Sequence, residues 1–241
     1  MSYHTGSIAA VPTANRQQYL DHARECWSLF QRHGATRMVE TWGEDVPHGT
    51  LTDFHRAVDP QDDETVTFGW ITWPDRASAD AAWQAMSEDP AMRDMQMPFD
   101  GSRMIWGGFA TVYEQGDAVG GGYYQGFALA VPAANRDAYV DMAGKGWEIF
   151  GRGGALGVVE AWGEDVPHGK RTDFHRATQA RDDEVIVFSW INWPDRATCD
   201  AAARAMEQDA GDTAQWEMPF DGKRMFWGGF VPLFDSASPV R

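Results

Sequence analysis

Two glutamates, Glu40 and Glu160, lie about 120 residues apart in nearly the same sequence surroundings. Each follows a valine and stands two residues before a tryptophan, in a run that predicts a buried strand. Burial raises the pKa of a carboxyl group towards the range of a general base. The alternative is that each carboxylate is half of a buried ion pair. The possible partners are Arg56 and Arg103 in the first case and Arg176 and Arg224 in the second.

A second group of polar residues follows each glutamate. It consists of His48, Asp53 and His55, and it recurs as His168, Asp173 and His175. A histidine oriented by an aspartate can serve as an acid or base or contact a substrate. The same residue types can hold a metal ion, but this spacing matches no recognised motif, so we assign no metal ligand. The remaining interpretation is a hydrogen-bonded loop in which the aspartate caps a turn.

Repeated arginines and tryptophans supply candidate substrate contacts. Arg56 and Arg176 could bind an anionic group through two parallel hydrogen bonds, although a salt bridge to a nearby carboxylate is favoured. Trp42 and Trp162 could form the wall of an aromatic pocket or simply fill a wide core. The chain contains 12 tryptophans, and the sequence does not decide between these two uses.

Glycine pairs stand in the last expected strand of each half, at 107–108 and 228–229. Glycine inside a strand indicates a bulge or a close approach by a ligand or another backbone. Neither pair belongs to a nucleotide-binding motif. The two cysteines, Cys26 and Cys199, have no counterpart in the other half, and we interpret both as ordinary small helix residues.

These residues recur because the chain is a duplication. Residues 6–86 align with residues 126–206, and the segment 43–49 returns unchanged as 163–169. We predict a first repeat over 1–114, a glycine-rich linker over 115–122 and a second repeat over 123–241. Each repeat has the size of a small domain.

The first repeat shows a strand, helix, strand, strand, helix, strand pattern. The expected strands are 5–12, 35–43, 64–73 and 103–113, the expected helices are 14–33 and 75–88, and 52–58 is expected to be extended. This is the ferredoxin-like order, an α+β class in which helices cover one face of the sheet. The third strand of each repeat is apolar on both faces, so the second face also needs a cover. We infer that the sheets of the two repeats pack on each other as a barrel within one chain.

Five segments resemble a known family. They are 39–47, 52–57, 187–194, 218–225 and 228–230. Through these residues the chain resembles the YbaA-like bacterial family of unknown function over nearly all of both repeats. The resemblance implies the dimeric α/β-barrel fold, here formed by a tandem duplication, and implies no established reaction or catalytic residue. The wider superfamily includes cofactor-independent monooxygenases, lactone isomerases and haem enzymes, so fold alone does not select a chemistry.

The composition limits the partners. The 241 residues include 36 Asp and Glu against 20 Lys and Arg, a net charge of -16, which opposes binding to nucleic acid or to an anionic membrane. No apolar run could span a bilayer and no export signal is visible. We therefore expect a cytoplasmic protein that binds a small molecule without a cofactor, as a pseudo-dimeric monomer or a homodimer.

Two classes of function fit these residues. The first is an enzyme in which Glu40 and Glu160, or His55 and His175 oriented by the aspartates, transfer protons. Arg56, Arg176, His48, His168, Trp42 and Trp162 would then contact the substrate. Cofactor-independent monooxygenation, isomerisation and a lyase step on a small aromatic or carbonyl compound all suit this arrangement. The second class is a non-catalytic ligand-binding or stress-related protein. Because the candidate residues are intact in both halves, the sequence predicts two equivalent sites.

Overall fold

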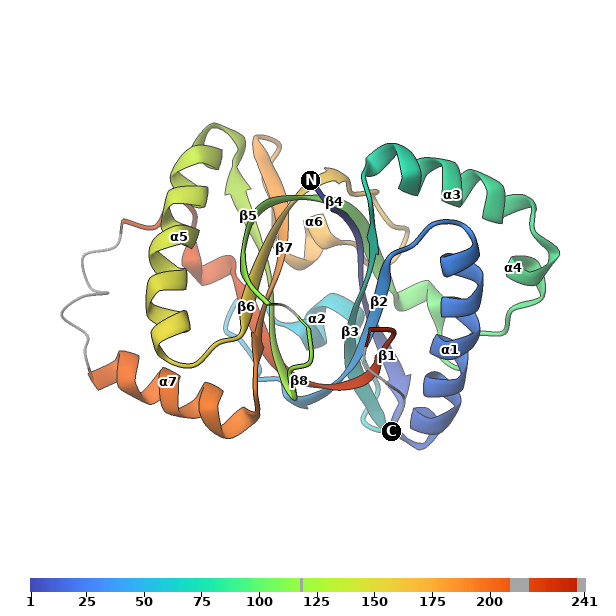
Figure 1. Ribbon diagram of the computed structural model, residues 1–241, viewed down its shortest axis with the longest axis horizontal. Coiled ribbons are helices and arrows are strands. Elements are labelled where there is room, and N and C mark those ends of the chain that lie inside the picture. Colours follow the sequence, from blue (N-terminus) through green and yellow to red (C-terminus); the bar gives the residue numbers. More distant parts are fainter. Residues whose placement is uncertain (118, 209–216, 238–241) are drawn as a thin grey trace.

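The two repeats adopt the same succession of elements in a computed structural model that describes residues 1–117, 119–208 and 217–237 (Figure 1). The first repeat contains β1 (Tyr3–Pro12), α1 (Arg16–Arg32), β2 (Arg37–Asp45), α2 (Phe54–Val58), β3 (Glu64–Trp73), α3 (Arg76–Glu88), α4 (Pro90–Asp94) and β4 (Ile105–Gly116). The second contains β5 (Tyr123–Pro132), α5 (Arg136–Arg152), β6 (Gly157–Asp165), α6 (Phe174–Ala177), β7 (Glu184–Trp193), α7 (Arg196–Gln208) and β8 (Phe226–Asp235). The expected α+β order is confirmed.

All eight strands close into one antiparallel barrel, in the order β1-β3-β2-β8-β5-β7-β6-β4. Each repeat contributes four neighbouring strands, and the two seams join β2 to β8 and β4 to β6. Closure therefore leaves no unpaired sheet edge, because each repeat completes the other. The predicted barrel formed by two duplicated sheets is confirmed.

Aromatic side chains from both repeats fill the barrel. The rings of Phe68 and Phe188 stack with centroids 4.3 Å apart, and those of Trp70 and Trp190 stack at 4.2 Å. A Cβ atom at Gly6 would lie 2.9 Å from the ring of Phe188, so glycine on β1 makes room for this stack. One face of the third strand of each repeat is apolar because it lines this interior, and the other face is apolar because it packs against the outer helices.

The short helix α2 corrects one expectation, since residues 52–58 were predicted to be extended. The side chain of Asp53 accepts a hydrogen bond from the backbone N–H of Arg56 and caps this helix. Phe54, the next residue, is fully buried in the barrel core. Asp173 and Phe174 repeat this arrangement at α6. A one-turn helix is too short for its periodicity to be recognised, and its capping aspartate was the available signal.

The glycine pairs mark close approaches, although by a side chain and not by the predicted ligand or second backbone. A Cβ atom at Gly108 would lie 2.0 Å from the hydroxyl oxygen of Tyr3, and one at Gly229 would lie 1.7 Å from that of Tyr123. The pairing of β4 with β6 also shifts register beside Gly108. A larger residue at either position would displace a buried tyrosine.

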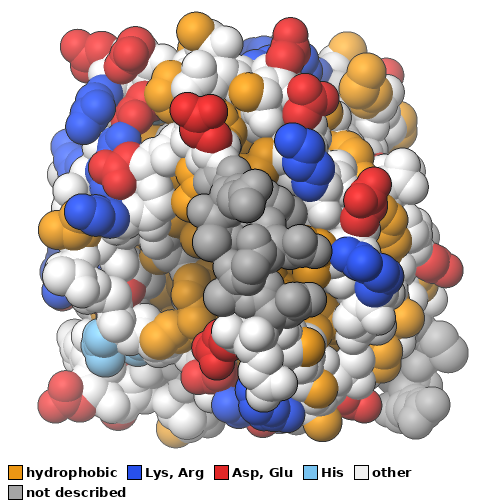
Figure 2. Space-filling model, turned by 90° about the vertical axis from the view of Figure 1, so that its left-hand side faces the viewer, with side chains coloured by type: hydrophobic (Ala, Val, Ile, Leu, Met, Phe, Trp, Pro, Cys, Tyr) orange, Lys and Arg blue, Asp and Glu red, His pale blue; other side chains and the backbone are white. Residues whose placement is uncertain are grey.

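Helices cover the outside of the barrel in two groups, α1, α3 and α4 on one side and α5 and α7 on the other (Figure 1). Acidic and basic side chains are interspersed over the face that carries α5 and α7 (Figure 2). Within the described ranges, no helix combines the length and the apolar character needed to cross a membrane. The spaces between helices and barrel are where the candidate glutamates lie.

Candidate active site

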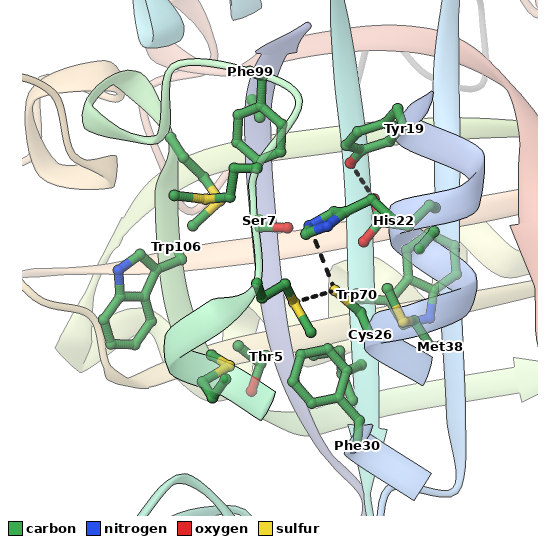
Figure 3. A pocket seen from close by; sticks show the side chains of 18 of the residues that line it. Thr5, Ser7, Tyr19, His22, Cys26, Phe30, Met38, Trp70, Phe99 and Trp106 are labelled. Carbon is green, nitrogen blue, oxygen red and sulfur yellow. Dashed lines mark hydrogen bonds between the residues drawn. The ribbon is translucent and has the colours of Figure 1, made fainter. Parts of the chain in front are cut away.

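A cavity of about 380 Å³ opens between the outer face of the barrel and the helices of the first repeat. Thr5, Ser7 and Ala9 of β1 form its floor. Tyr19, His22 and Cys26 project from α1 towards it, and Phe99 and Trp106 lie on the opposite wall (Figure 3). Trp106 is 43% exposed and lies where the cavity meets solvent. The volume is within the range of about 300–1,000 Å³ typical of small-molecule sites.

Glu40 reaches this cavity from β2 and is buried there. Its carboxylate accepts a hydrogen bond of 2.6 Å from the hydroxyl of Tyr19. Gly69 stands opposite on β3, where a Cβ atom would lie 2.3 Å from the carboxylate. The Glu40 side chain therefore lies over Gly69 and uses the space left by the missing side chain.

The ion-pair alternative for Glu40 is not what the structure shows. Arg103 pairs with the buried Glu64, and Arg56 pairs with Asp53 at 2.9 Å. In the described part of the chain, no arginine, lysine or histidine forms a salt bridge with Glu40. In the second repeat Arg224 pairs with Glu184 in the same way.

Burial without a cation changes the acidity of Glu40. Desolvation raises the pKa of its carboxyl group to about 7, and the hydrogen bond from Tyr19 opposes this shift by stabilising the carboxylate. The same burial and the adjacent carboxylate raise the pKa of Tyr19 well above its usual value, so the phenol remains a donor. A carboxyl group with a pKa near 7 can accept and return a proton at neutral pH.

The histidine and aspartate group lies elsewhere, at the loop before α2. Asp53 accepts from the backbone of Gly49 and Arg56, and the rings of His48 and His55 stack with centroids 4.1 Å apart. A 3.0 Å hydrogen bond joins His55 Nε2 to the carbonyl of Val46. His168, Asp173 and His175 repeat these contacts at α6. This geometry is that of a hydrogen-bonded loop, and the structure does not place the group at the Glu40 cavity.

Arg56 and Arg176 are brought together rather than placed beside the glutamates. Both line a small cavity of about 160 Å³ between α2 and α6. Each guanidinium donates to a loop carbonyl and pairs with the aspartate that caps its helix. The favoured salt-bridge interpretation is thus the arrangement seen.

The predicted tryptophan wall is one step removed from the cavity. Trp42 packs behind Tyr19, with ring centroids 6.2 Å apart, and the guanidinium carbon of Arg16 lies 5.7 Å above its ring. Trp162 has the same relation to Tyr139 and Arg136. Both tryptophans support the tyrosine that contacts the glutamate.

The second repeat keeps the hydrogen-bonded pair of a tyrosine and a glutamate, but the residues around the pair differ. Tyr139 donates a 2.6 Å hydrogen bond to Glu160, and burial raises the pKa of Glu160 to about 7 as well. On β5, however, Phe127 and Leu129 stand where Ser7 and Ala9 stand on β1. Phe127 and Leu129 pack in one apolar cluster with Tyr139. Large side chains therefore occupy the positions on β5 that correspond to the open cavity floor on β1.

Sequence reasoning missed Tyr19 and Tyr139 as site residues. Both were recognised only as apolar positions on a helix. The signal was available, because a repeated tyrosine facing a strand that carries a buried carboxylate provides a hydroxyl that needs a partner. The sequence also shows small residues on β1 where β5 has large ones. Without the cavity, this difference could not be interpreted as open and filled space.

Comparisons with known proteins agree with the duplicated architecture. A family model described as "Protein of unknown function (DUF1428)" matches residues 2–101 and again residues 122–222. The uncharacterized protein YbaA of Escherichia coli K12 is 48% identical over 114 residues, which are 47% of this chain and 97% of YbaA. The uncharacterized protein YbaA of Shigella flexneri is also 48% identical to this chain over 114 residues.

Solved structures share the fold across both repeats. An anthrone oxidase-like protein superposes with a TM-score of 0.59 at 13% identity, covering 97% of this chain and 92% of its own. A candidate monooxygenase from Fusobacterium nucleatum gives a TM-score of 0.55 at 10% identity, covering 97% and 93%. Such identities establish the fold, that of dimeric α/β-barrel proteins, and nothing about activity. The two matches to one family model decide the family: the chain belongs to DUF1428, whose domain it contains twice in tandem.

Proposed function

We propose that the first repeat is the active site of an acid/base enzyme, with Glu40 as the proton acceptor for an apolar aromatic substrate. The observation that carries this proposal is the position of Glu40, a buried carboxyl group with no cationic partner among the described residues, facing an apolar cavity. A purely structural carboxylate is normally compensated by a cation, as Glu64 is by Arg103. An uncompensated carboxylate that faces a cavity favours a catalytic use.

The reaction that suits this site best is oxygenation without a cofactor. The substrate class is a fused-ring aromatic ketone with an acidic CH₂ group, as in an anthrone. Glu40 would remove one proton, and the carbanion would be stabilised by delocalisation into the ring system and carbonyl. Reaction with dioxygen then converts the CH₂ group into a second carbonyl and releases water, so that R₂CH₂ and O₂ give R₂C=O and H₂O. Dioxygen is the oxidant, and Glu40 returns its proton to the departing oxygen.

Tyr19 and the cavity wall support this chemistry. The Tyr19 hydroxyl holds the carboxylate in place and stabilises its charged form, which makes it available as a base. Thr5 and Ser7 bring hydroxyl groups to an otherwise apolar floor, where they can hydrogen-bond a substrate carbonyl. Two proteins of the same fold, an anthrone oxidase-like protein and a candidate monooxygenase, support the same reaction class by analogy.

The test is turnover of an anthrone by the purified chain, followed by oxygen uptake and by product absorption. We expect one O₂ consumed per substrate, and a loss of turnover of at least about 100-fold in Glu40→Gln with substrate binding retained. Proton exchange at the substrate CH₂ without oxygen uptake would contradict oxygenation and favour an isomerase. Binding without turnover in the unaltered protein would contradict catalysis and favour the ligand-binding alternative.

A further inference from the structure

A cluster of soft donor atoms lines the same cavity on the side of α1. The sulfur of Cys26 lies 3.4 Å from Nε2 of His22 and 3.3 Å from the sulfur of Met95. His22 and Cys26 are four residues apart, so they project from one face of the helix towards the cavity (Figure 3). Met95 approaches from the segment that follows α4 and also lines the cavity.

The two separations from the Cys26 sulfur are close to those between the ligands of a small metal ion. Metal–ligand bonds of about 2.0–2.3 Å place the donors of a trigonal site roughly 3.5–4 Å apart. The observed separations from the Cys26 sulfur are slightly shorter, so outward movement of a few tenths of an ångström would admit an ion. Met95 and His22 are only partly buried and line an open cavity, which permits such movement.

The donor types select a soft monovalent ion. Thiolate and thioether sulfur prefer Cu(I), while Mg²⁺, Ca²⁺ and Mn²⁺ prefer oxygen ligands. No third His, Cys, Asp or Glu side chain completes a harder site among the described residues. Five of the eleven methionines in the chain line this one cavity, so further thioethers surround the cluster. A Cu(I) ion bound to one thiolate is also a neutral unit, which limits the cost of burying it.

The imidazole of His22 has little else to hold it. Its Nδ1 is buried and has no hydrogen-bond partner within the described residues, and its Nε2 contacts the Cys26 sulfur.

From this arrangement we infer that Cys26, His22 and Met95 form a Cu(I) site in the first repeat. Binding forms a Cu–S bond and breaks the S–H bond of Cys26, and one proton leaves to solvent without any electron transfer. The second repeat has Met142 and Gly146 at the positions of His22 and Cys26, so it lacks the cluster. The site is separate from the proposed proton transfer, which requires only Glu40.

The experiment is an anaerobic titration with Cu(I) in competition with a Cu(I) chelator. The unaltered chain should bind one equivalent, release one proton, and develop the near-ultraviolet absorption of a Cu(I)–thiolate. Cys26→Ala should lose more affinity than the roughly 10–100-fold that removing an outer-shell partner costs. Met95→Leu should lose less than Cys26→Ala.

Cys199→Ala is the matched control, because Cys199 is an equally buried helix cysteine whose thiol pKa is raised to about 11. This variant should bind Cu(I) like the unaltered chain. Equal binding by Cys26→Ala, equal loss in Cys199→Ala, or no binding by the unaltered chain would overturn the site. Circular dichroism establishes that each variant is folded, and turnover by metal-free protein tests the proposed enzyme independently.

Discussion

On β1 of the first repeat, Ser7 and Ala9 face α1, whereas Phe127 and Leu129 face α5 from β5 of the second. The backbone around them is the same, and each repeat keeps a tyrosine hydroxyl 2.6 Å from a buried or partly buried glutamate. Both copies of the fold therefore hold the tyrosine–glutamate pair, but only the first has an open cavity floor beside it. Residues that carry chemistry can be retained in a duplicate after the space for a substrate has been filled.

The residue opposite each glutamate on the third strand is also smaller in the first repeat than in the second. Gly69 faces Glu40, and Ser189 occupies the equivalent position beside Glu160. The hydrogen bond from Tyr139 and then the nearby Ser189 hydroxyl oppose the rise of the pKa of Glu160. In the second repeat the carboxylate is therefore partly exposed, and the tyrosine that holds it is packed in an apolar cluster.

The largest effect should come from exchanging the floor residues. Ser7→Phe puts the second-repeat side chain into the first-repeat cavity, and we expect ligand binding and turnover to be abolished because the ring occupies the substrate volume. Calorimetric titration of the ligand measures this.

Phe127→Ser is the matched control for that exchange. It should leave ligand binding within twofold and lower the free energy of unfolding by about 2–3 kcal/mol, since it removes a ring from an apolar cluster. If Ser7→Phe still binds ligand while Phe127→Ser does not, the assignment of the two repeats is reversed.

Both repeats should make the free energy of unfolding depend on pH, whereas we expect only the first repeat to bind ligand. The folded protein holds a proton on Glu40 up to a pKa of about 7, while the unfolded chain releases it near the ordinary value of 4.5. The free energy of unfolding therefore falls as pH rises through this window, by up to about 3 kcal/mol for Glu40. Glu160 should contribute in the same direction but less, because it is partly exposed.

Denaturant unfolding of Glu40→Gln measures this contribution. The variant should be more stable than the unaltered protein at pH 8 and no more stable at pH 4, where the carboxyl group is protonated in both folded and unfolded states. A gain in stability that is the same at both pH values would show that the carboxyl group does not titrate as described.

A smaller effect is expected from the tyrosine hydroxyls. Tyr19→Phe removes the hydrogen bond that lowers the pKa of Glu40, so the midpoint of the pH–rate profile should move to higher pH, with a modest loss of turnover. Tyr139→Phe should leave the profile unchanged, since Phe127 and Leu129 replace the open cavity floor in the second repeat. A shift with both variants would indicate that both glutamates act.

The architecture was predictable because it depends on features that a single sequence displays. Repeated glycines and tryptophans revealed the duplication, and the apolar residues on both faces of 185–191 required the barrel. The one-turn helices α2 and α6 were missed because one turn shows no periodicity. Their capping aspartates were instead assigned to possible chemistry.

The site was predictable only in part. Glu40 was recognised because a carboxylate in an apolar strand is conspicuous, whereas its partner Tyr19 comes from a helix and required the packing to be known. His55 and Arg56 were grouped with Glu40 because they are near in sequence, yet they lie at α2, where loop contacts hold them. Cys26 was interpreted as an ordinary helix residue because the second repeat has no cysteine at this position. It is one of the residues in which the cavity of the first repeat differs from the second repeat.

We propose that the first repeat acts and the second does not, and the turnover of Glu160→Gln distinguishes this from two active repeats. Measured beside Glu40→Gln under saturating substrate, Glu160→Gln should keep nearly all of the activity, while Glu40→Gln loses at least about 100-fold. Two equivalent sites would leave about half of the activity in each variant. That result would contradict the account.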